Sequence, residues 1–463
     1  MRAVAVAMGL ALSACSSGQP ASPAGSVSSS GQPASPAESV SSSGQPASPV
    51  SLEYRLWDSV QQVGYQKCVD AFEKVNPTIK VTISEVPWDS YWTKLTTEQA
   101  AGQGPDVFTD ESSHFTELHA QNQVMDITQF VKDDNIDLSK YVQSTLAVYQ
   151  DGAKTYGLPK DVGSDTLGLN LDIFHKLGVT VPTDLSWSPS GGLDTLLPLA
   201  MKLTVDTSGR NASQPGFDPN NVVTYGIGVS NNDQPIRSFF YSNGAYIIDK
   251  PGGTQWGFDT PKGKEALQYL SDLVNKYHVA PPGALTNPPK DGATELFQRG
   301  AVAMEVTGSW QVGDMHSKAS FPISYIQMPA GPAGHVVPGG NGLADAISPT
   351  TKHPKEAWEL MKYLASTDCG GAIMASGGYV LPGRSDSMSM FSDYWQKQGQ
   401  DVTAFLDAAN GKTVGTPNTN GFTQASIAYT QVLSQLFLGQ ITAQEAAVMA
   451  TQKAAAAQAQ ATQ

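Results

Sequence analysis

From Leu52 onward, short apolar runs typical of β-strands alternate with longer segments whose apolar residues recur every three or four positions, as on one face of a helix. The first part of this region predicts strands at 52–57, 79–86 and 105–108. A helix is predicted before Asn76-Pro77, because proline cannot continue a helix, and a second one over 88–101. This strand–helix–strand–helix–strand order favours a parallel α/β sheet.

The middle of the chain repeats this alternation, and the C-terminal part is largely helical. Strands are predicted at 166–170 and 224–229, and helices at 193–203, 262–277, 354–365 and 425–437. The sequence Thr442-Ala443-Gln444-Glu445 is a capping box, in which the Thr and Glu side chains satisfy free backbone N–H groups at a helix start. A last helix is therefore predicted to begin there.

The residues before this region have a different composition. Residues 3–14 are small and apolar and follow Arg2. A membrane-spanning helix needs about 20 apolar residues, so this shorter stretch predicts a signal peptide. It ends in Leu12-Ser13-Ala14-Cys15, which resembles the bacterial lipoprotein cleavage box. The resemblance implies cleavage before Cys15, lipidation of its thiol, and a protein held at the extracytoplasmic face of the cell membrane.

Residues 16–50 are of low complexity. The hexamer Gly-Gln-Pro-Ala-Ser-Pro starts at Gly18, Gly31 and Gly44, with Ser-rich spacers between the copies. Such a segment has too little apolar surface to offset the entropy cost of ordering it. It predicts a disordered tether between the lipid and the folded body.

Length and charge narrow the class of protein. The chain has 463 residues, whereas single domains usually hold about 100–200, so two or three domains or two large lobes are expected. Its 28 Lys and Arg against 42 Asp and Glu give a formal net charge of −14. Nucleic acids and anionic lipids bind basic patches. We therefore expect no nucleic-acid partner, and membrane contact through the lipid anchor only.

The sequence lacks the motifs of common enzymes. It contains neither a Gly-x-Ser-x-Gly motif nor a Gly-x-x-x-x-Gly-Lys-Ser/Thr phosphate loop. His114 and His119 are five residues apart, a spacing that does not let them share a metal ion on a helix, and we expect both at the surface. With Cys15 lipidated, Cys68 and Cys369 remain, either as a disulfide or as two buried thiols. No catalytic residue, metal or cofactor is expected.

Five sequence blocks, in order along residues 52–450, resemble one known family. They are Pro-Asp-Val-Phe at 105–108, Tyr-Gly-Leu-Pro-Lys-Asp at 156–161 with Asp165-Thr166, Asn170 and Phe174, Phe-Gln-Arg-Gly-Ala-Val-Ala-Met at 297–304 with Gly-Ser-Trp at 308–310, Gly-Gly-Asn-Gly-Leu at 339–343, and Ala-Trp at 357–358. Together they resemble the extracellular solute-binding proteins of sugar ABC importers. The resemblance implies an α/β, two-lobe periplasmic-binding-protein-like fold of type II, with the ligand cleft between the lobes. Two extra residues at 163–164 and a long insert at 208–221 depart from the family pattern.

The resemblance also implies a domain organisation. After the signal peptide at 1–14 and the lipidated tether at 15–50, the lobes are expected at 51–160 plus 343–382 and at 161–342 plus 383–463. The chain would cross between them near 160, 343 and 382, and the lobes would close on ligand by a hinge motion. We expect a monomer that binds a mono- or oligosaccharide and delivers it to the permease subunits of an ABC transporter.

The chemistry of sugars selects the candidate ligand-binding residues. The C–H face of a sugar ring stacks on aromatic rings, and its hydroxyls hydrogen-bond to carboxylates and amides. Open α/β sheets bind ligands at the carboxyl ends of their strands. The predicted ligand-binding residues are Trp57, Trp88, Glu111, Asp161, Asp165, Tyr241, Asn243, Trp256, Trp310, Gly340 and Asn341.

These candidates are expected to play different parts. Trp310, which follows the strand expected at 302–306, is the foremost stacking residue. Glu111 and Asp161 are the expected acceptors, and Asp165 is the alternative to Asp161 because of the insertion between them. Residues 239–244 resemble a ligand-contacting loop of the family and contribute Tyr241 and Asn243. Trp92, Trp187 and Trp395 are assigned no role.

Other interpretations stay open. A secreted carbohydrate-active hydrolase would use two carboxylates, such as Glu111 and Asp161, as acid and base or nucleophile. The same fold could bind a non-sugar ligand such as a polyamine, which requires several convergent carboxylates. Ferric-ion binders with this fold use adjacent tyrosines, and the sequence has no Tyr-Tyr pair. A surface adhesin displayed on the tether is a further possibility.

Overall fold

The computed structural model describes residues 49–230, 233–287, 292–335, 337–339, 341–411 and 413–462. The predicted signal peptide, Cys15 and nearly all of the predicted tether lie outside these residues. Contacts between residues separate Ser48–Gln463, as one compact unit, from Met1–Ala47. Among the helices of the described ranges, none is both long enough and apolar enough to cross a bilayer.

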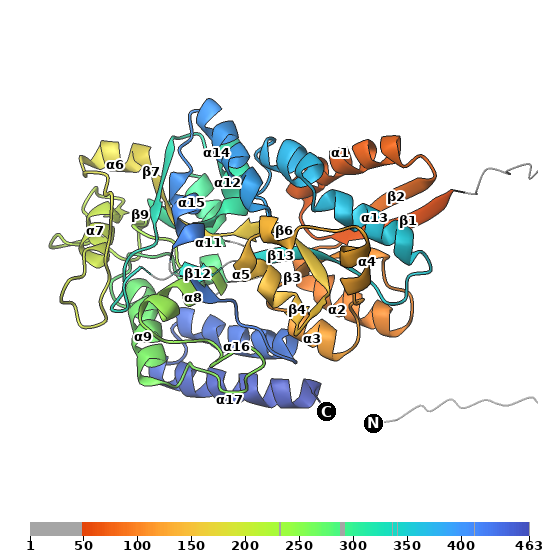
Figure 1. Ribbon diagram of the computed structural model, residues 1–463. Helices are drawn as coiled ribbons and strands as arrows, with labels where there is room; N and C mark the ends of the chain where they lie inside the picture. Colours follow the sequence, from red (N-terminus) through yellow and green to blue (C-terminus); the bar gives the residue numbers. More distant parts are fainter. Residues whose placement is uncertain are drawn as a thin grey trace, which may run out of the picture. The chain divides into compact units, whose positions relative to one another are not determined.

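The first sheet has five strands in the order β2-β1-β3-β13-β6. Its strands are β1 (Val50–Leu56), β2 (Ile79–Glu85), β3 (Val107–Glu111), β6 (Gly157–Gly163) and β13 (Asn341–Ile347). β1 pairs in parallel with β2 and β3, as predicted, while β13 runs antiparallel to both β3 and β6. The sheet is therefore mixed, and a strand from late in the chain lies between two early ones (Figure 1).

The helices of this region follow their local sequence signals. α1 (Ser59–Val75) begins after Asp58, whose carboxylate accepts hydrogen bonds from the backbone N–H groups of Val60 and Gln61, and it ends before Asn76-Pro77. α2 (Trp88–Ala100) begins at the predicted tryptophan. The sequence predicted both helices correctly because their start and stop signals are local.

The second sheet has three strands in the order β10-β7-β11, formed by β7 (Asp165–Asn170), β10 (Met304–Gly308) and β11 (Ile323–Gln327). Both pairings are antiparallel, so the parallel arrangement expected for the middle of the chain is wrong. The predicted strand at 224–229 is also wrong. β9 (Val222–Thr224) is short and pairs with β8 (Val205–Asp206), and the N–H groups of Gly226 and Ile227 donate to the Val279 carbonyl instead of a strand.

The other elements are helices and short strands outside these two sheets. They are α3 (Phe115–Ala120), α4 (Thr128–Asp133), η1 (Leu138–Lys140), α5 (Gln143–Val148), β4 (Gln150–Asp151), β5 (Lys154–Thr155), α6 (Leu171–Leu177), α7 (Leu196–Leu203), α8 (Asp233–Ser242), α9 (Pro261–Asn275), α10 (Gly283–Thr286), α11 (Gly292–Gln298), η2 (Ser309–Gln311), α12 (Val312–Lys318), β12 (Val337–Gly339), α13 (Pro354–Leu364), η3 (Thr367–Ala375), η4 (Ser385–Ser387), α14 (Met388–Lys397), α15 (Thr403–Asn410), β14 (Thr413–Gly415), α16 (Phe422–Phe437) and α17 (Ala443–Ala461). The predicted capping box starts α17, where Thr442 and Glu445 bond to each other's backbone N–H groups.

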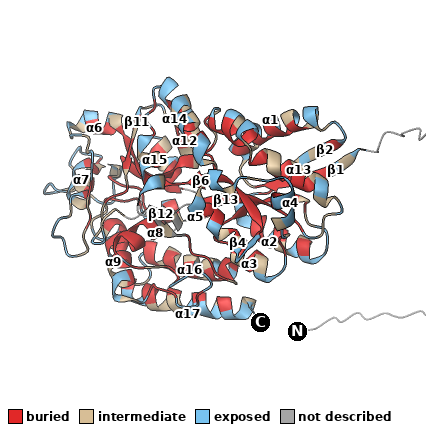
Figure 2. Cartoon of the chain, viewed as in Figure 1, coloured by how far each residue is buried: buried red, intermediate tan, exposed pale blue. Residues whose placement is uncertain are grey.

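Each sheet has its own hydrophobic core, and we call the two parts the first and the second lobe. In the first lobe, buried residues of β1, α1 and α13 pack together, and Phe108, Phe115 and Leu118 belong to a neighbouring cluster on the same sheet. In the second lobe, buried residues of β7, α8, α9, α16 and α17 belong to one core. Figure 2 shows this burial along the strands and the inner helix faces.

A disulfide links Cys68 of α1 to Cys369 of η3, and the Cα atoms of the two residues are 5.3 Å apart. The bridge spans 301 residues of sequence. Of the two possibilities that the sequence left open for these cysteines, the structure contains the disulfide.

Three chain segments pass side by side between the two sheets. Leu343 of β13 lies opposite Asp161 of β6, and Asp161 also forms a bridge with Pro382. The Val162 N–H donates to the Leu381 carbonyl over 2.9 Å, and the Gly383 N–H donates to the Lys160 carbonyl over 3.0 Å. Only Ser164 separates β6 of the first sheet from β7 of the second. A hinge motion between the lobes would therefore change the backbone conformation of these short crossing segments.

Candidate ligand-binding site

A cluster of tryptophans lies where β1 ends and α2 begins. The ring centroid of Trp57 is 5.1 Å from that of Trp88 and 5.5 Å from that of Trp92. Trp88 is 44% exposed and Trp57 is partly buried, whereas Trp92 is only 6% exposed. The cluster therefore contains two of the four tryptophans predicted to bind ligand, and it offers accessible aromatic surface for a ligand ring.

The sequence missed two members of this cluster, Trp92 and His114. Their rings stack with centroids 3.7 Å apart and planes 10° apart. His114 is 4% exposed, so its predicted surface position is wrong, while His119 is partly exposed. Burial lowers the pKa of His114 to about 3, so its ring is neutral at neutral pH. The i,i+4 spacing of Trp88 and Trp92 on one helix was the available signal for Trp92.

Glu111 and Asp161 flank the same strand. Both lie opposite Leu343 in the register of β13, Glu111 from β3 and Asp161 from β6. Both are buried, and the Ser113 hydroxyl donates to Glu111 Oε2 over 2.7 Å. The structure thus brings together, around one strand, two carboxylates that are 50 residues apart in the sequence.

Asp161 carries an unusual carboxyl group. Burial raises its pKa to about 7, against the lowering effect of Lys160, and the charges of Asp345 and Asp58 raise it further. Its Oδ2 atom is buried and has no hydrogen-bond partner among the described residues. A buried carboxyl oxygen without a hydrogen bond lowers the stability of the folded state, because it has lost its contact with water. A hydrogen bond from a ligand hydroxyl would remove this penalty.

The second lobe adds another polar group of residues. Asp165 of β7 is buried, and the Gln234 side-chain amide donates to its Oδ1 over 3.1 Å. Burial raises the pKa of Asp165, and the charge of Arg237 on α8 opposes this effect. Glu305 of β10 is also buried, and its carboxylate lies so close to Gly228 that a Cβ there would meet Oε2 at 1.6 Å. Sequence reasoning did not select Arg237 or Glu305.

Trp310 follows β10 in η2, close to the crossing segments. The strand before it is 304–308 instead of the predicted 302–306. The adjacent Ser309 ties it to β6, because the Ser309 N–H donates to the Ser164 carbonyl over 3.0 Å and its hydroxyl donates to the Val162 carbonyl over 3.3 Å. The indole lies over Gly308, where a Cβ would be 2.5 Å from the ring, and Trp310 is only partly buried.

Three other predicted site residues lie in the interior of the second lobe. Tyr241 belongs to α8 and is buried, so its predicted place in a loop is wrong. The Asn243 amide donates to the Lys262 carbonyl over 2.8 Å, and the Trp256 indole N–H donates to Gln458 Oε1 over 3.0 Å. These groups are thus used in packing and hydrogen bonding within the lobe.

The last two predicted site residues cannot be compared with the structure. Gly340 lies outside the described residues. Asn341 begins β13, but its side chain is likewise outside what the structure describes. Both therefore remain predictions from the sequence block that contains them.

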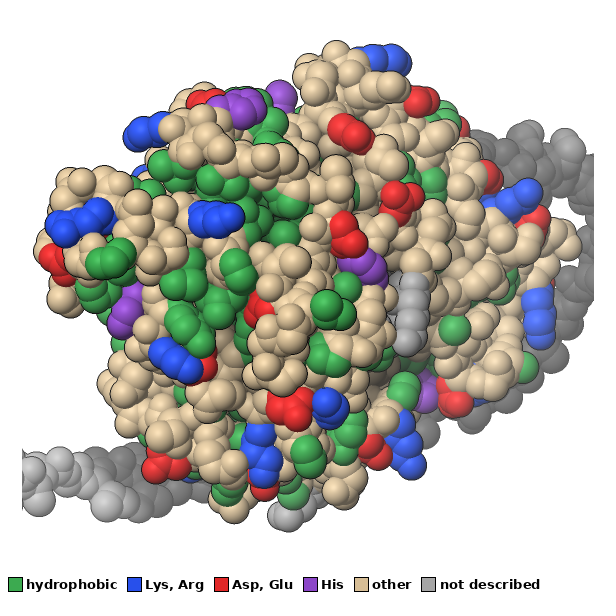
Figure 3. Space-filling view, turned by 90° about the vertical axis from the view of Figure 1, so that its left-hand side faces the viewer, with side chains coloured by type: hydrophobic (Ala, Val, Ile, Leu, Met, Phe, Trp, Pro, Cys, Tyr) green, Lys and Arg blue, Asp and Glu red, His purple; other side chains and the backbone are tan. Residues whose placement is uncertain are grey.

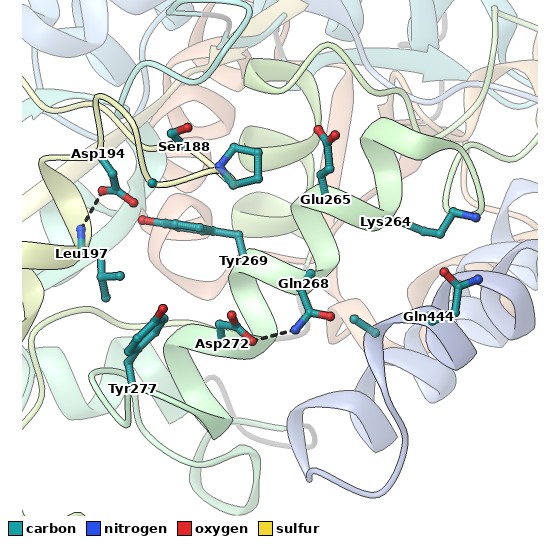
Figure 4. A pocket seen from close by; sticks show the side chains of 13 residues that line it. Ser188, Asp194, Leu197, Lys264, Glu265, Gln268, Tyr269, Asp272, Tyr277 and Gln444 are labelled. Atoms are coloured by element: carbon teal, nitrogen blue, oxygen red, sulfur yellow. Dashed lines mark hydrogen bonds between the residues drawn. The ribbon is translucent and has the colours of Figure 1, made fainter.

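Two hollows open on the second lobe. One, of about 330 Å³, lies between the loop that carries Ser188 and the helix α9, and Figure 4 shows the Tyr269 side chain pointing toward Asp194 there. The other, of about 550 Å³, lies beside it and shares Glu265. None of the residues predicted to bind ligand lines either hollow.

On the face shown in Figure 3, Lys and Arg side chains are scattered singly among acidic ones. In the described ranges, no three His, Cys, Asp or Glu side chains come together in an arrangement that could hold a metal ion.

Two lobes with separate sheets, joined by three adjacent segments and carrying tryptophans and carboxylates near the strand ends, define a two-lobe periplasmic-binding-protein-type fold. Over residues 58–368 the chain matches the family of bacterial extracellular solute-binding proteins. It belongs to this family of solute-binding proteins.

Known relatives agree with this assignment. The chain is 22% identical to the arabinooligosaccharide-binding protein of Bacillus subtilis over 374 residues, which cover 77% of this chain and 80% of that protein. It is similar to the crystal structure of Mycobacterium tuberculosis UspC, with 28% identity, a TM-score of 0.70, and coverage of 88% of this chain and 100% of that one. It is also similar to the substrate-binding protein Lmo0181 of Listeria monocytogenes in complex with cycloalternan, with 21% identity, a TM-score of 0.76, and coverage of 88% and 98%.

Proposed function

We propose that this protein is the extracytoplasmic sugar- or oligosaccharide-binding component of an ABC transporter and delivers its ligand to the permease subunits. The observation that carries the proposal is the pairing of accessible tryptophans, Trp88 and Trp310, with buried carboxylates beside the crossing segments. Sugars need both an aromatic face and charged acceptors. The relatives named for arabinooligosaccharide and bound to cycloalternan support the same ligand class.

The proposed ligand site lies between the lobes. Trp57, Trp88 and Glu111 would contribute from the first lobe, Asp165 and Trp310 from the second. Asp161 would contribute from the crossing strand β6, where its Oδ2, which has no partner among the described residues, can bond to a ligand hydroxyl. The proposed lobe boundaries are 51–160 plus 343–382 and 161–342 plus 383–463, which places the three crossings at the adjacent segments described above.

We also propose that the protein is a monomeric lipoprotein anchored through Cys15. The apolar stretch at 3–14, the box Leu12-Ser13-Ala14-Cys15 and the Ser-rich repeat behind it support this anchor. Cys15→Ser should prevent lipidation and release the protein into the culture medium, whereas the parent protein stays with the membrane fraction. Membrane association of the Cys15→Ser protein would contradict the anchor.

Thermal unfolding in the presence of candidate ligands tests the binding function. A ligand that binds only the folded state stabilises it by about 2.7 kcal/mol at a concentration one hundred times its Kd. We expect a neutral mono- or oligosaccharide to raise the Tm by about 5 °C, and amino acids and simple salts to leave it unchanged. A shift with spermidine and with no sugar would favour a polyamine ligand instead.

Two variants of Trp310 link the ligand effect to the proposed site. Trp310→Ala should abolish most of the sugar-induced Tm shift, and Trp310→Phe, which keeps an aromatic face, should retain part of it. Both variants should unfold near the parent temperature without sugar, because Trp310 is only partly buried. A full sugar shift in Trp310→Ala would remove this residue from the site.

Incubation with oligosaccharides separates binding from hydrolysis. A binding protein leaves the oligosaccharide chain length unchanged, while a hydrolase that uses Glu111 and Asp161 would shorten it. Membership in a family of binding proteins favours the first outcome.

A further inference from the structure

A segment of the second lobe makes hydrogen bonds to the first lobe beside the proposed ligand contacts, where His114 Nε2 lies 3.7 Å from Glu111 Oε2. The Thr423 backbone N–H and hydroxyl both donate to Glu117 Oε2, over 3.1 and 2.8 Å. The Thr423 hydroxyl oxygen is also 2.9 Å from His114 Nδ1. Thr423 lies in the first turn of α16, while His114 and Glu117 belong to the α3 region that follows β3.

Neighbouring contacts strengthen the same junction. The Ser112 and Thr416 hydroxyl oxygens are 3.2 Å apart, and the Thr116 N–H donates to Asn418 Oδ1 over 3.3 Å. The Phe422 ring meets the His114 ring edge-on, with centroids 5.6 Å apart. All of these contacts join a residue of 112–117 to a residue of 416–423, and they are made by side chains and backbone of the chain itself.

The geometry determines which group donates the proton in each of these hydrogen bonds. A threonine hydroxyl has a single proton, which Thr423 donates to Glu117. Its oxygen must then accept a proton from His114, so His114 carries its proton on Nδ1. The result is a continuous chain from imidazole to hydroxyl to carboxylate, buried at all three residues. Such a chain breaks when the two lobes separate, because its members come from both.

We infer that His114, Glu117 and Thr423 form a latch that stabilises the closed arrangement of the lobes. The inference rests on the proposed function only in that closure is taken to accompany ligand binding. If ligand binds the closed arrangement, its apparent affinity is the intrinsic affinity reduced by the fraction of molecules that are closed. Thr423 is then a positioning residue, which sets affinity through the lobe equilibrium without contacting the ligand.

The latch is distinct from the aromatic surface offered to the ligand. Trp92 stacks on the His114 ring and is nearly buried, while Trp88 on the same helix remains exposed. The latch therefore also holds the His114 ring against Trp92, the buried member of the tryptophan cluster. Loss of the latch should loosen this cluster without removing any group that is proposed to touch sugar.

The test uses two variants of Thr423, one that lacks the hydroxyl and one that retains it. Thr423→Val keeps the shape of the side chain and removes the hydroxyl, and Thr423→Ser keeps the hydroxyl. Spin labels at Lys74→Cys on α1 and Lys202→Cys on α7, both exposed positions, report the distance between the lobes. The full chain is used in a Cys15→Ser background, so that the introduced cysteines are the reactive thiols.

We expect Thr423→Val to shift the ligand-free distance distribution toward longer distances, and Thr423→Ser to match the parent. The Kd for a sugar found in the thermal screen should rise about tenfold in Thr423→Val, the effect of losing a hydrogen bond to a charged group. Circular dichroism should be unchanged, which separates opening from unfolding. If Thr423→Val does not fold, Glu117→Gln, which removes the charge of the acceptor, provides the same comparison.

An unchanged distance distribution in the folded variant would overturn the latch. A parent protein that binds no sugar would contradict the proposed function instead, and the distance measurement would still decide on the latch. A raised Kd with unchanged distances would also overturn it, because Thr423 would then act on the ligand directly.

Discussion

Replacing Lys160 by methionine should strongly destabilise the first lobe. The Lys160 ammonium is buried and lies 2.6 Å from Tyr54 Oη, 2.8 Å from Thr109 Oγ1 and 3.3 Å from Asp345 Oδ1. It also lies over the Tyr65 ring, 3.9 Å from the centroid. Lys160→Met keeps the length and apolar stem of the side chain and removes only the charged group.

The magnitude follows from what the substitution leaves behind. Removing one partner of a buried ion pair typically costs about 3–5 kcal/mol, because the other charge stays buried without compensation. Here Asp345 is fully buried, but its Oδ1 still accepts a hydrogen bond from Tyr54 over 3.0 Å and lies 3.3 Å from Thr109 Oγ1. We therefore expect a loss of about 3 kcal/mol in the free energy of unfolding, near the lower end of that range.

Urea unfolding followed by circular dichroism measures this loss, and a double-mutant cycle assigns it. Adding Asp345→Asn to Lys160→Met removes the orphaned charge, so the double variant should be more stable than the sum of the single losses by about 1–3 kcal/mol. A loss below about 1 kcal/mol for Lys160→Met, or strictly additive single losses, would refute the argument that a buried charge pair holds this part of the lobe.

Three further predictions concern other buried groups. Replacing Cys68 and Cys369 together by alanine should lower the free energy of unfolding, measured in urea titrations, by about 2–5 kcal/mol, because the bridge closes a loop between residues 301 positions apart. Ligand titrations of the same variant should be unchanged. The raised pKa of Asp161, about 7 when folded, means that the stability linked to this group is present below its unfolded pKa of 3.8 and is lost as the pH rises toward 7, by at most about 1.4 kcal/mol per pH unit. Asp161→Asn should flatten unfolding free energies measured between pH 4 and 8, and an unchanged slope would argue against a buried Asp161 carboxyl. The lowered pKa of His114, about 3 when folded, should cause a loss of stability as the pH falls from about 6.5 toward 3, and His114→Gln should reduce that loss.

Much of the local structure was predictable because its signals lie within a few residues. The end of α1 at Asn76-Pro77, the start of α2 at Trp88 and the capping box of α17 all depend on backbone groups that neighbouring side chains satisfy or remove. The ordered sequence blocks predicted the family and the two-lobe fold, and the comparisons confirm both. The choice of Trp57, Trp88, Glu111 and Asp161 as ligand contacts rests on the rule that ligands bind near strand ends, and it stays a prediction.

Pairing and burial were decided by the tertiary structure. The antiparallel second sheet depends on strands separated by more than a hundred residues of sequence, and propensity does not report which strands pair. The disulfide required two helices to bring Cys68 and Cys369 within bonding distance. His114 has a polar side chain typical of a surface, but Trp92 stacks on its ring, and Phe422 and Thr423 of the other lobe pack against it. The sequence by itself thus determined the elements and the kind of protein, because those depend on local chemistry, whereas the burial and pairing of each polar group depended on which distant segment packs over it.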